Sequence, residues 1–274
     1  MNFLAILDYY SRNGLYQSKH EYLDKFHHLM FFAGKEKINI DDIHDYCSLR
    51  SLSGVKNSTI NRELTIARSA INYYNKHNDD NIKNPFNGFN LFEADFIPRY
   101  LNAKECGLLL ETCKQYSNPL FHSYISLLLN TGCRSGELLT LQWDNVFLDD
   151  RYLIIRNSLS KNKKTVYKPL NNQAVKVLSE LSQLDTGYVF LNIRTQDRYK
   201  SFRKAWLWTK DRTGLDCRIH DLRHTFASLL VSSGVPLYHV SQLLGHSDTR
   251  ITQRYAHLSP DNLLDVVQSL PQFG

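Results

Sequence analysis

The chain has 274 residues, of which 42% are hydrophobic and 22% charged, a composition typical of one large or two medium globular domains. It contains no run of about eighteen apolar residues and no charged-then-apolar leader, which argues against a membrane-spanning or secreted protein, and we expect a cytoplasmic one. The five cysteines are scattered without a C-x-x-C pair, so we expect reduced core thiols rather than disulfides or a zinc site.

The net charge of +6 is unevenly distributed along the chain. Residues 1–96 carry 11 lysines and arginines against 12 acidic residues, whereas residues 97–274 carry 22 against 15. The segment from Arg194 to Arg218 alone contains eight basic residues, interleaved with tyrosine, phenylalanine and tryptophan. Basic side chains among aromatic ones can hold a nucleic-acid backbone. The alternative is a solvated helix face whose aromatic side chains point into the core.

Residues 1–92 are predicted to form a small helical domain. Its clearest helix follows the cap-type pair Asn57-Ser58, and apolar residues recur at intervals of three and four from Ile60 onwards. Further amphipathic helices are expected near residues 3–7, 22–30 and 40–49. The face opposite the apolar one shows Arg62 and Arg68, the candidates in this domain for contact with a nucleic acid.

Helical periodicity breaks between residues 78 and 99, where two prolines, one glycine and five asparagines occur. We assign residues 93–100 to an interdomain linker and residues 101–274 to a second domain. That domain opens with a capping box of Asn102 and Glu105, and Asn118-Pro119 begins its second helix.

Arg134 and Glu137 follow that second helix, three residues apart. Their ion pair is either structural, since exposed pairs contribute little, or a device by which Glu137 fixes Arg134 as a phosphate clamp. The β-prone runs at residues 152–156 and 165–170 then flank a basic tip and predict a hairpin. A helix begun by Asn171 and a short strand at residues 188–191 are expected next.

The densest chemistry lies between residues 219 and 260. His220 and Arg223 are three residues apart and share one face of a helix that Gly234 is placed to end. Pro236 begins a short helix, and Thr249 is expected to cap the helix that carries a tyrosine. A last apolar helix is expected from residue 260. Arginine recognises two oxygens of a phosphate through parallel N–H bonds, so the stretch suits phosphoryl transfer.

Three segments of the chain resemble the boxes of the tyrosine recombinases, also called the phage integrase family: TGCRSGELLTL, HDLRHTFASLLVSSGV and LLGHSDTRITQRYAHL. They occur in the family's order and cover the chain from about residue 97 onwards. The resemblance implies a mainly helical fold: a helical core-binding domain, supported by STINRELTIARSAINYY, followed by a catalytic domain with a small β-sheet. Several boxes at matching spacing are far more specific than one motif.

The resemblance also implies a role for each matched residue. Tyr255 would attack the scissile phosphate and form a 3′-phosphotyrosyl link, while Arg134 and Arg223 would clamp the non-bridging oxygens. His246 would assist by hydrogen bonding, and His220 would be a candidate to take the tyrosine proton. A tyrosine with an ordinary pKa of about 10 needs such help to act as a nucleophile at neutral pH.

The remaining matched residues are an acid and a lysine. Glu137 matches the residue that supports the first arginine, and Lys161 on the hairpin would protonate the leaving 5′-oxygen. Lys163 and Lys164 are close rivals for that role, and Tyr167-Lys168 departs from the family, which more often has a basic and then an apolar residue there. The further candidates for DNA contact are Lys163, Lys164, Arg203 and Lys204.

The partners implied are double-stranded DNA with specific core sites, three further copies of the chain in a tetramer that forms a Holliday junction, and DNA-bending accessory proteins. No cofactor or metal is expected, because the cations of the site are side chains. The length leaves no room for the additional arm-binding domain of some phage integrases, so the two-domain form is expected.

Three alternatives to an integrase stay open at this point. A resolvase of chromosome or plasmid dimers belongs to the same family. A non-catalytic DNA-binding regulator would use the same fold. A metallohydrolase would use the H-x-x-x-H spacing of His220 and His224, with His246 or His257 as third ligand, but would leave Tyr255 without a role. Otherwise, His224 and His257 are interpreted as packing or phosphate-contacting groups.

Overall fold

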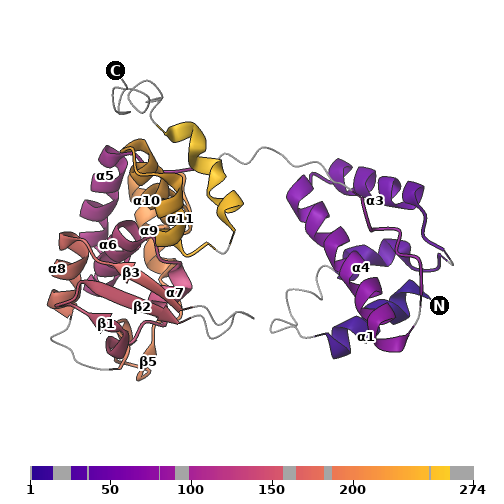
Figure 1. Ribbon diagram of the computed structural model, residues 1–274, viewed down its shortest axis with the longest axis horizontal. Coiled ribbons are helices and arrows are strands. Elements are labelled where there is room, and N and C mark those ends of the chain that lie inside the picture. Colours follow the sequence, from indigo (N-terminus) through magenta and orange to yellow (C-terminus); the bar gives the residue numbers. More distant parts are fainter. Residues whose placement is uncertain are drawn as a thin grey trace, which may run out of the picture. The chain divides into compact units, whose positions relative to one another are not determined.

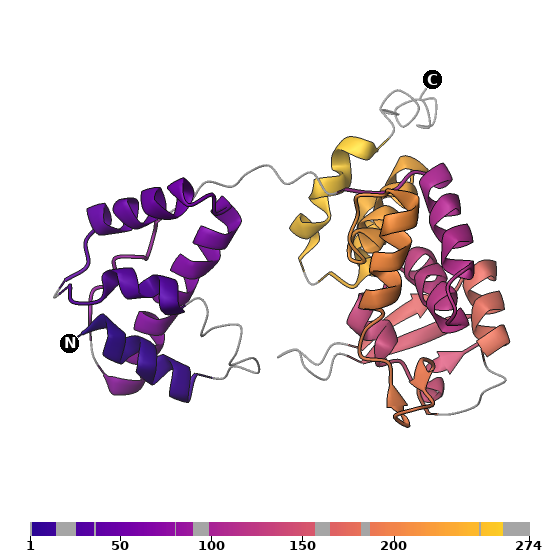
Figure 2. The same cartoon turned by 180° about the vertical axis from the view of Figure 1, so that it is seen from behind.

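The computed structural model describes residues 2–14, 26–35, 37–79, 81–89, 99–156, 165–181, 187–246 and 248–259. The chain divides into two compact units, Met1–Phe96 and Ile97–Gly274, each with its own core. The division falls within the segment predicted as linker, residues 93–100, most of which lies outside the described residues. Figures 1 and 2 show the two units from opposite sides. No helix in the described ranges is long and apolar enough to cross a membrane.

The described part of the first unit is helical, as predicted. It comprises α1 (Phe3–Asn13), the 3-10 turn η1 (Met30–Phe32), α3 (Ile40–Leu52) and α4 (Asn57–Asn78). The apolar face of α4 is buried from Ile60 to Tyr74 against α1 and α3. The predicted cap is wrong in detail: α4 begins one residue earlier, after Lys56, and no side chain caps it.

A buried carboxylate ties α3 to α4. Glu63 accepts hydrogen bonds from Tyr46 Oη at 2.7 Å and from Arg50 Nη2 at 2.7 Å. Its side chain is only 1% exposed, so the arginine is needed to compensate its charge. The pair therefore fixes the angle at which the two helices meet.

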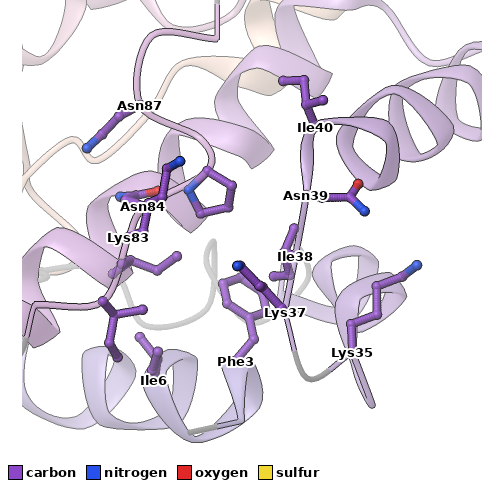
Figure 3. A pocket seen from close by; sticks show the side chains of 13 residues that line it. Phe3, Ile6, Lys35, Lys37, Ile38, Asn39, Ile40, Lys83, Asn84 and Asn87 are labelled. Carbon is purple, nitrogen blue, oxygen red and sulfur yellow. The ribbon is translucent and has the colours of Figure 1, made fainter.

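The first unit also contains a pocket of about 420 Å³ between α1 and the two loops around Ile38 and Pro85. Figure 3 shows Lys37 and Lys83 at this pocket, together with Asn39 and the apolar side chain of Ile38. None of the residues predicted to be catalytic lines it.

The second unit begins with helices whose sequence signals are confirmed. In α5 (Ala103–Lys114), Asn102 and Glu105 form the predicted capping box, with both bonds at 2.9 Å. Asn118 caps α6 (Pro119–Thr131), which ends at Gly132 in a left-handed conformation, φ 59°. The five-residue helix α7 (Ser135–Leu139) follows, with Arg134 at its N-cap.

A three-stranded antiparallel sheet of order β1-β2-β3 lies at one end of the second unit in Figure 1. It is formed by β1 (Val146–Phe147), β2 (Tyr152–Arg156) and β3 (Thr165–Pro169), so the predicted hairpin is confirmed. Its tip, residues 157–164, lies outside the described residues. The predicted strand at 188–191 is wrong: only β4 (Leu191–Asn192) forms there, paired with β5 (Asp197–Arg198).

Two helices flank this sheet and the helical core. Asn171 caps α8 (Asn172–Leu181) by accepting from the Ala174 amide at 2.8 Å. The basic aromatic segment forms α9 (Arg203–Thr213), preceded by Phe202. Phe202 and Trp206 are buried in the core and Tyr199 packs against it, as the alternative interpretation predicted. Trp208 is half-buried and contacts Tyr116 and the guanidinium of Arg212.

The last described elements are α10 (Asp221–Ser232), α11 (Leu237–Leu244) and the 3-10 turns η4 (Thr249–Ile251) and η5 (Gln253–Leu258). Helix α10 packs between α6 and α11, and η5 packs on α10. The continuous helix expected from Thr249 is wrong: two 3-10 turns form instead, on either side of Thr252. The helix expected from residue 260 lies outside the described residues.

Candidate active site

Arg223 stands at the centre of the candidate site. It lies in the first turn of α10, it is only 4% exposed, and its guanidinium joins two other elements. Nη1 donates to the carbonyl of Gly132 at 2.8 Å, and Nη2 donates to the carbonyl of Leu244 at 2.7 Å. Burial, and then the nearby charge of Arg134, lower its pKa to about 10. The arginine therefore joins the ends of α6 and α11 and remains cationic at neutral pH.

Arg134 is the second arginine and the more exposed of the two, with 44% of its side chain accessible. Glu137 accepts from both its backbone N–H and its Nη1, each at 2.7 Å. The carboxylate is thus held by the helix start and by the guanidinium together. The supporting role of Glu137 stays a prediction, and Nε and Nη2 of Arg134 have no described protein partner.

His246 follows the C-terminal end of α11. Gly245 provides the left-handed turn, φ 67°, that places the histidine, and the His246 amide donates to the Ser241 carbonyl. Its Nδ1 lies 2.8 Å from Thr252 Oγ1. Burial, and then the charges of Arg223 and Arg134, lower its pKa to about 4. The imidazole is therefore neutral at pH 7 and lies within electrostatic reach of both arginines.

Tyr255 lies on η5 and is 1% exposed, among apolar side chains of α10 and α11. Its hydroxyl lies 2.5 Å from Nδ1 of His224. The sequence interpretation treated His224 as a packing or phosphate-contacting group, so this contact with the predicted nucleophile was missed. The residues are 31 positions apart, and no local pattern pairs them.

The protonation states of this pair follow from their burial. Burial, and then nearby His220, lower the pKa of His224 to about 4, whereas burial raises the pKa of Tyr255 above its ordinary 10. Both shifts favour the proton on the tyrosine oxygen rather than on this histidine. In the free chain, the predicted nucleophile Tyr255 is therefore protonated and buried.

His220 is exposed at the N-cap of α10, and its ring centroid lies 5.0 Å from that of His224. Desolvation, and then the charge of Arg223, lower its pKa. The described contact to the tyrosine hydroxyl comes from His224, so His220 adjoins the nucleophile through a second histidine. The role predicted for His220 in taking the tyrosine proton stays a prediction.

The hairpin contributes one residue that the sequence interpretation did not place in the site. Lys161, Lys163 and Lys164 lie outside the described residues, and their roles stay predictions. Lys168, on β3, is described: it is 2% exposed and donates to the Leu243 carbonyl. The sequence showed Lys168 only as a departure from the family pattern, and its burial follows from contacts with β2 and α11.

The predicted DNA contacts differ in the exposure of their side chains. Arg203 and Lys204 are exposed in the first turn of α9, and Arg62 is exposed on α4. Arg68 has an internal role instead, since it donates to the carbonyls of Phe86 at 2.9 Å and Phe89 at 3.1 Å. These contacts to DNA stay predictions.

The metallohydrolase alternative requires three convergent ligands. Within the described ranges, no group of three histidine, cysteine, aspartate or glutamate side chains is placed to hold a metal ion. Nδ1 of His224 faces the Tyr255 hydroxyl, and Nδ1 of His246 faces the Thr252 hydroxyl. These contacts favour a site of hydroxyl and phosphate chemistry over a metal centre.

Comparison with known proteins identifies the family. The model of the phage integrase family matches residues 99–262. The tyrosine recombinase XerC of Bacillus pumilus is 30% identical over 261 residues, which cover 87% of this chain and 83% of the relative. Three phage integrases are 27 to 31% identical, and the aligned regions span 46 to 64% of their lengths.

Solved structures show the same fold across both units. The Tn1549 transposon integrase, in complex with a circular intermediate DNA, has a TM-score of 0.79 at 17% identity over 98% of this chain and all of that one. A lambda integrase tetramer bound to a Holliday junction has a TM-score of 0.71 at 18% identity over 91% of this chain and 78% of that one. The chain therefore belongs to the phage integrase family of tyrosine recombinases, which are DNA breaking-rejoining enzymes.

Proposed function

We propose that the chain is a site-specific DNA recombinase that integrates and excises a phage or other mobile element. The proposal rests on five side chains that come together around α10 from elements far apart in sequence. They are Arg134, Arg223, the neutral His224 and His246, and the buried Tyr255. Arg223 lies within electrostatic reach of Arg134 and Tyr255, and His246 within reach of both arginines. Such a set suits a phosphodiester, whose non-bridging oxygens gather charge during displacement.

The proposed reaction begins with attack by Tyr255 Oη on the scissile phosphorus. A bond forms between phosphorus and the tyrosine oxygen, the bond to the 5′-oxygen breaks, and the DNA is left attached through a 3′-phosphotyrosyl link. Arg134, Arg223 and His246 stabilise the charge on the non-bridging oxygens. Each such donor typically contributes roughly 3 to 4 kcal/mol to the transition state.

Two protons move in this step. The tyrosine proton leaves towards the histidines of α10, where His224 holds the hydroxyl in the free chain and His220 is the adjoining candidate. The leaving 5′-oxygen takes a proton, for which Lys161 on the hairpin is the proposed donor. The reverse reaction rejoins a 5′-hydroxyl to the link, and the phosphoester bond energy is kept throughout.

The proposed substrate is double-stranded DNA with specific core sites, bound by both units and exchanged in a tetramer of this chain. The likeness to integrases solved with DNA, one of them a tetramer on a Holliday junction, supports this assembly. The proposed contacts to DNA include Arg62, Arg203 and Lys204, and accessory proteins would bend the DNA. Action on cellular DNA places the protein in the cytoplasm.

A covalent trap tests the nucleophile, the reaction and the target together. The protein is incubated with sheared DNA of its host, denatured, and the protein-linked ends are sequenced. Wild type should yield ends that converge on one sequence, linked through their 3′-phosphate, while Tyr255→Phe should yield none and should bind the recovered DNA as tightly as wild type. Tyr238→Phe is the matched control, since Tyr238 is 63% exposed on neighbouring α11.

The position of the recovered ends separates the two recombinase roles. Ends at the boundaries of an inserted element support an integrase, whereas ends at a single chromosomal or plasmid site support a resolvase. Linked DNA that persists in Tyr255→Phe would show that the nucleophile is another residue. Binding of DNA without any linked product in wild type would favour the non-catalytic regulator.

A further inference from the structure

Lys168 occupies a position where the strand pattern calls for an apolar side chain. In β3 the exposed and inward-facing residues alternate, with Tyr167 63% exposed and Val166 and Lys168 facing inward. Its strand partner is Leu153 of β2, which is fully buried. An ammonium in such a place is far more costly than a valine or leucine, because it must give up its hydration.

In the described part of the chain, one hydrogen bond compensates for the lost hydration of the Lys168 amino group. Lys168 Nζ donates to the carbonyl of Leu243, and within the described parts of the chain the lysine forms no ion pair. Around it lie Cys133 before α7, Glu137 and Arg134 of the α7 start, and Arg223 of α10, all within electrostatic reach. Desolvation is the main cause that lowers the pKa of Lys168.

The bond connects the hairpin to the residues that precede His246. Leu243 gives its carbonyl to Lys168, and the next residue, Leu244, gives its carbonyl to Arg223. Two basic side chains from different elements therefore donate to successive carbonyls at the C-terminal end of α11. The last carbonyls of a helix have no partner within the helix and accept such bonds from lysine or arginine.

A second contact joins the same two elements. Gly245, which turns the chain from α11 towards His246, packs so closely on β3 that a Cβ there would lie 3.0 Å from both methyl carbons of Val166. Val166 and Lys168 are thus two inward side chains of β3 that meet α11 on either side of its last residue. The base of the hairpin is therefore in direct contact with the turn that precedes His246.

We propose that Lys168 is a positioning residue of the recombination site, which fixes the end of α11 on β3 and thereby holds His246 in register with the bound phosphate. The catalytic part of this inference rests on the proposed function. Its structural part concerns the free chain and can be measured without DNA.

Amide exchange in the free protein is the first test. The amides of Gly245 and His246 donate to the carbonyls of Gln242 and Ser241, and they should exchange roughly tenfold or more faster in Lys168→Met than in wild type. Lys176→Met is the matched control, because Lys176 is exposed on α8, and its exchange should equal that of wild type. Unchanged exchange in Lys168→Met would overturn the proposal.

Cleavage of the DNA recovered in the covalent trap is the second test. Lys168→Met should slow the cleavage step on the order of 10- to 100-fold, the effect expected of a misplacement of about 1 Å, with an apparent Kd within about twofold of wild type. In a His246→Ala background the same change should add less than about threefold, because the group it positions is gone. A full additional loss would show that Lys168 does not act through His246.

A second variant covers the case in which Lys168→Met does not fold. Val166→Ala removes the other contact between β3 and this turn, that of Val166 with Gly245, and should give the same pattern. Exchange at residues 245–246 should be faster, and cleavage should be slower, with little additional loss when Val166→Ala is combined with His246→Ala. If wild type forms no covalent adduct, the proposed function has failed, and amide exchange still decides whether Lys168 fixes the α11 end.

Discussion

Arg223 differs from Arg134 in holding the fold as well as the proposed substrate, and replacing it by methionine tests this difference. Two opposing contributions set the stability of Arg223→Met. Losing the bonds to the Gly132 and Leu244 carbonyls costs about 1.5–3 kcal/mol each. Removing a buried cation whose pKa is lowered from 12.5 to about 10 returns about 3 kcal/mol. The expected net loss is about 0–3 kcal/mol.

The cleavage rate should respond much more strongly than the stability. A donor to the non-bridging oxygens is worth on the order of 10²–10³ in rate, so Arg223→Met should lose at least that factor while remaining folded. Urea unfolding measures the stability, and single-turnover cleavage of the trapped DNA sequence measures the rate. Arg134→Met is the matched control, because its side chain is 44% exposed: it should lose a similar rate factor with a stability change within about 0.5 kcal/mol. Destabilisation of Arg134→Met by more than about 0.5 kcal/mol, or of Arg223→Met by clearly more than about 3 kcal/mol, would refute the reasoning.

Three further predictions concern the surroundings of the site. The pKa of both His224 and His246 is about 4 in the folded protein, against 6.5 in the unfolded chain. The unfolded state therefore binds protons at a higher pH, and the free energy of unfolding should fall as the pH drops from about 6.5 to about 4. An equal urea midpoint at pH 7 and pH 4.5 would contradict this prediction. Gly132→Ala should destabilise the protein by about 2–4 kcal/mol, because the added Cβ would clash with the ring of Phe226. Gly234→Ala is the control: its Cβ would meet no neighbour, and the left-handed backbone at φ 83° should cost only about 1 kcal/mol in the same unfolding assay. Glu137→Gln should slow cleavage about tenfold with little change in DNA affinity, and an unchanged rate would show that Arg134 needs no carboxylate.

The features predicted correctly from the sequence are those whose causes are local. A capping box needs residues three apart, so Asn102 and Glu105 were found from spacing alone, and the same holds for the pair of Arg134 and Glu137. The apolar face of α4 follows from helical periodicity. Arg223 was also placed correctly, in the first turn of the helix α10.

The features missed from the sequence depend on contacts between distant elements. The Tyr255–His224 contact requires η5 to fold back on α10, and the contact of the Thr252 hydroxyl with His246 requires the same chain reversal. Lys168 was noted only as a departure from the family, since a lysine in a strand is normally solvent-facing. Its burial becomes visible only when β3 is paired with β2 and covered by α11.

The site of the free chain is consistent with a tyrosine that reacts only when DNA is bound. Tyr255, the proposed nucleophile, is 1% exposed, burial raises the pKa of its hydroxyl, and burial lowers the pKa of neighbouring His224 to about 4, so both burial and protonation disfavour attack in the free chain. We expect a bound phosphodiester to change the protonation equilibrium between tyrosine and histidine. Its negative charge offsets the arginines and raises the pKa of the nearby histidines, which favours proton transfer from the tyrosine. The substrate to be cleaved therefore helps to create the base that activates the nucleophile, and we expect reactivity to appear only on DNA.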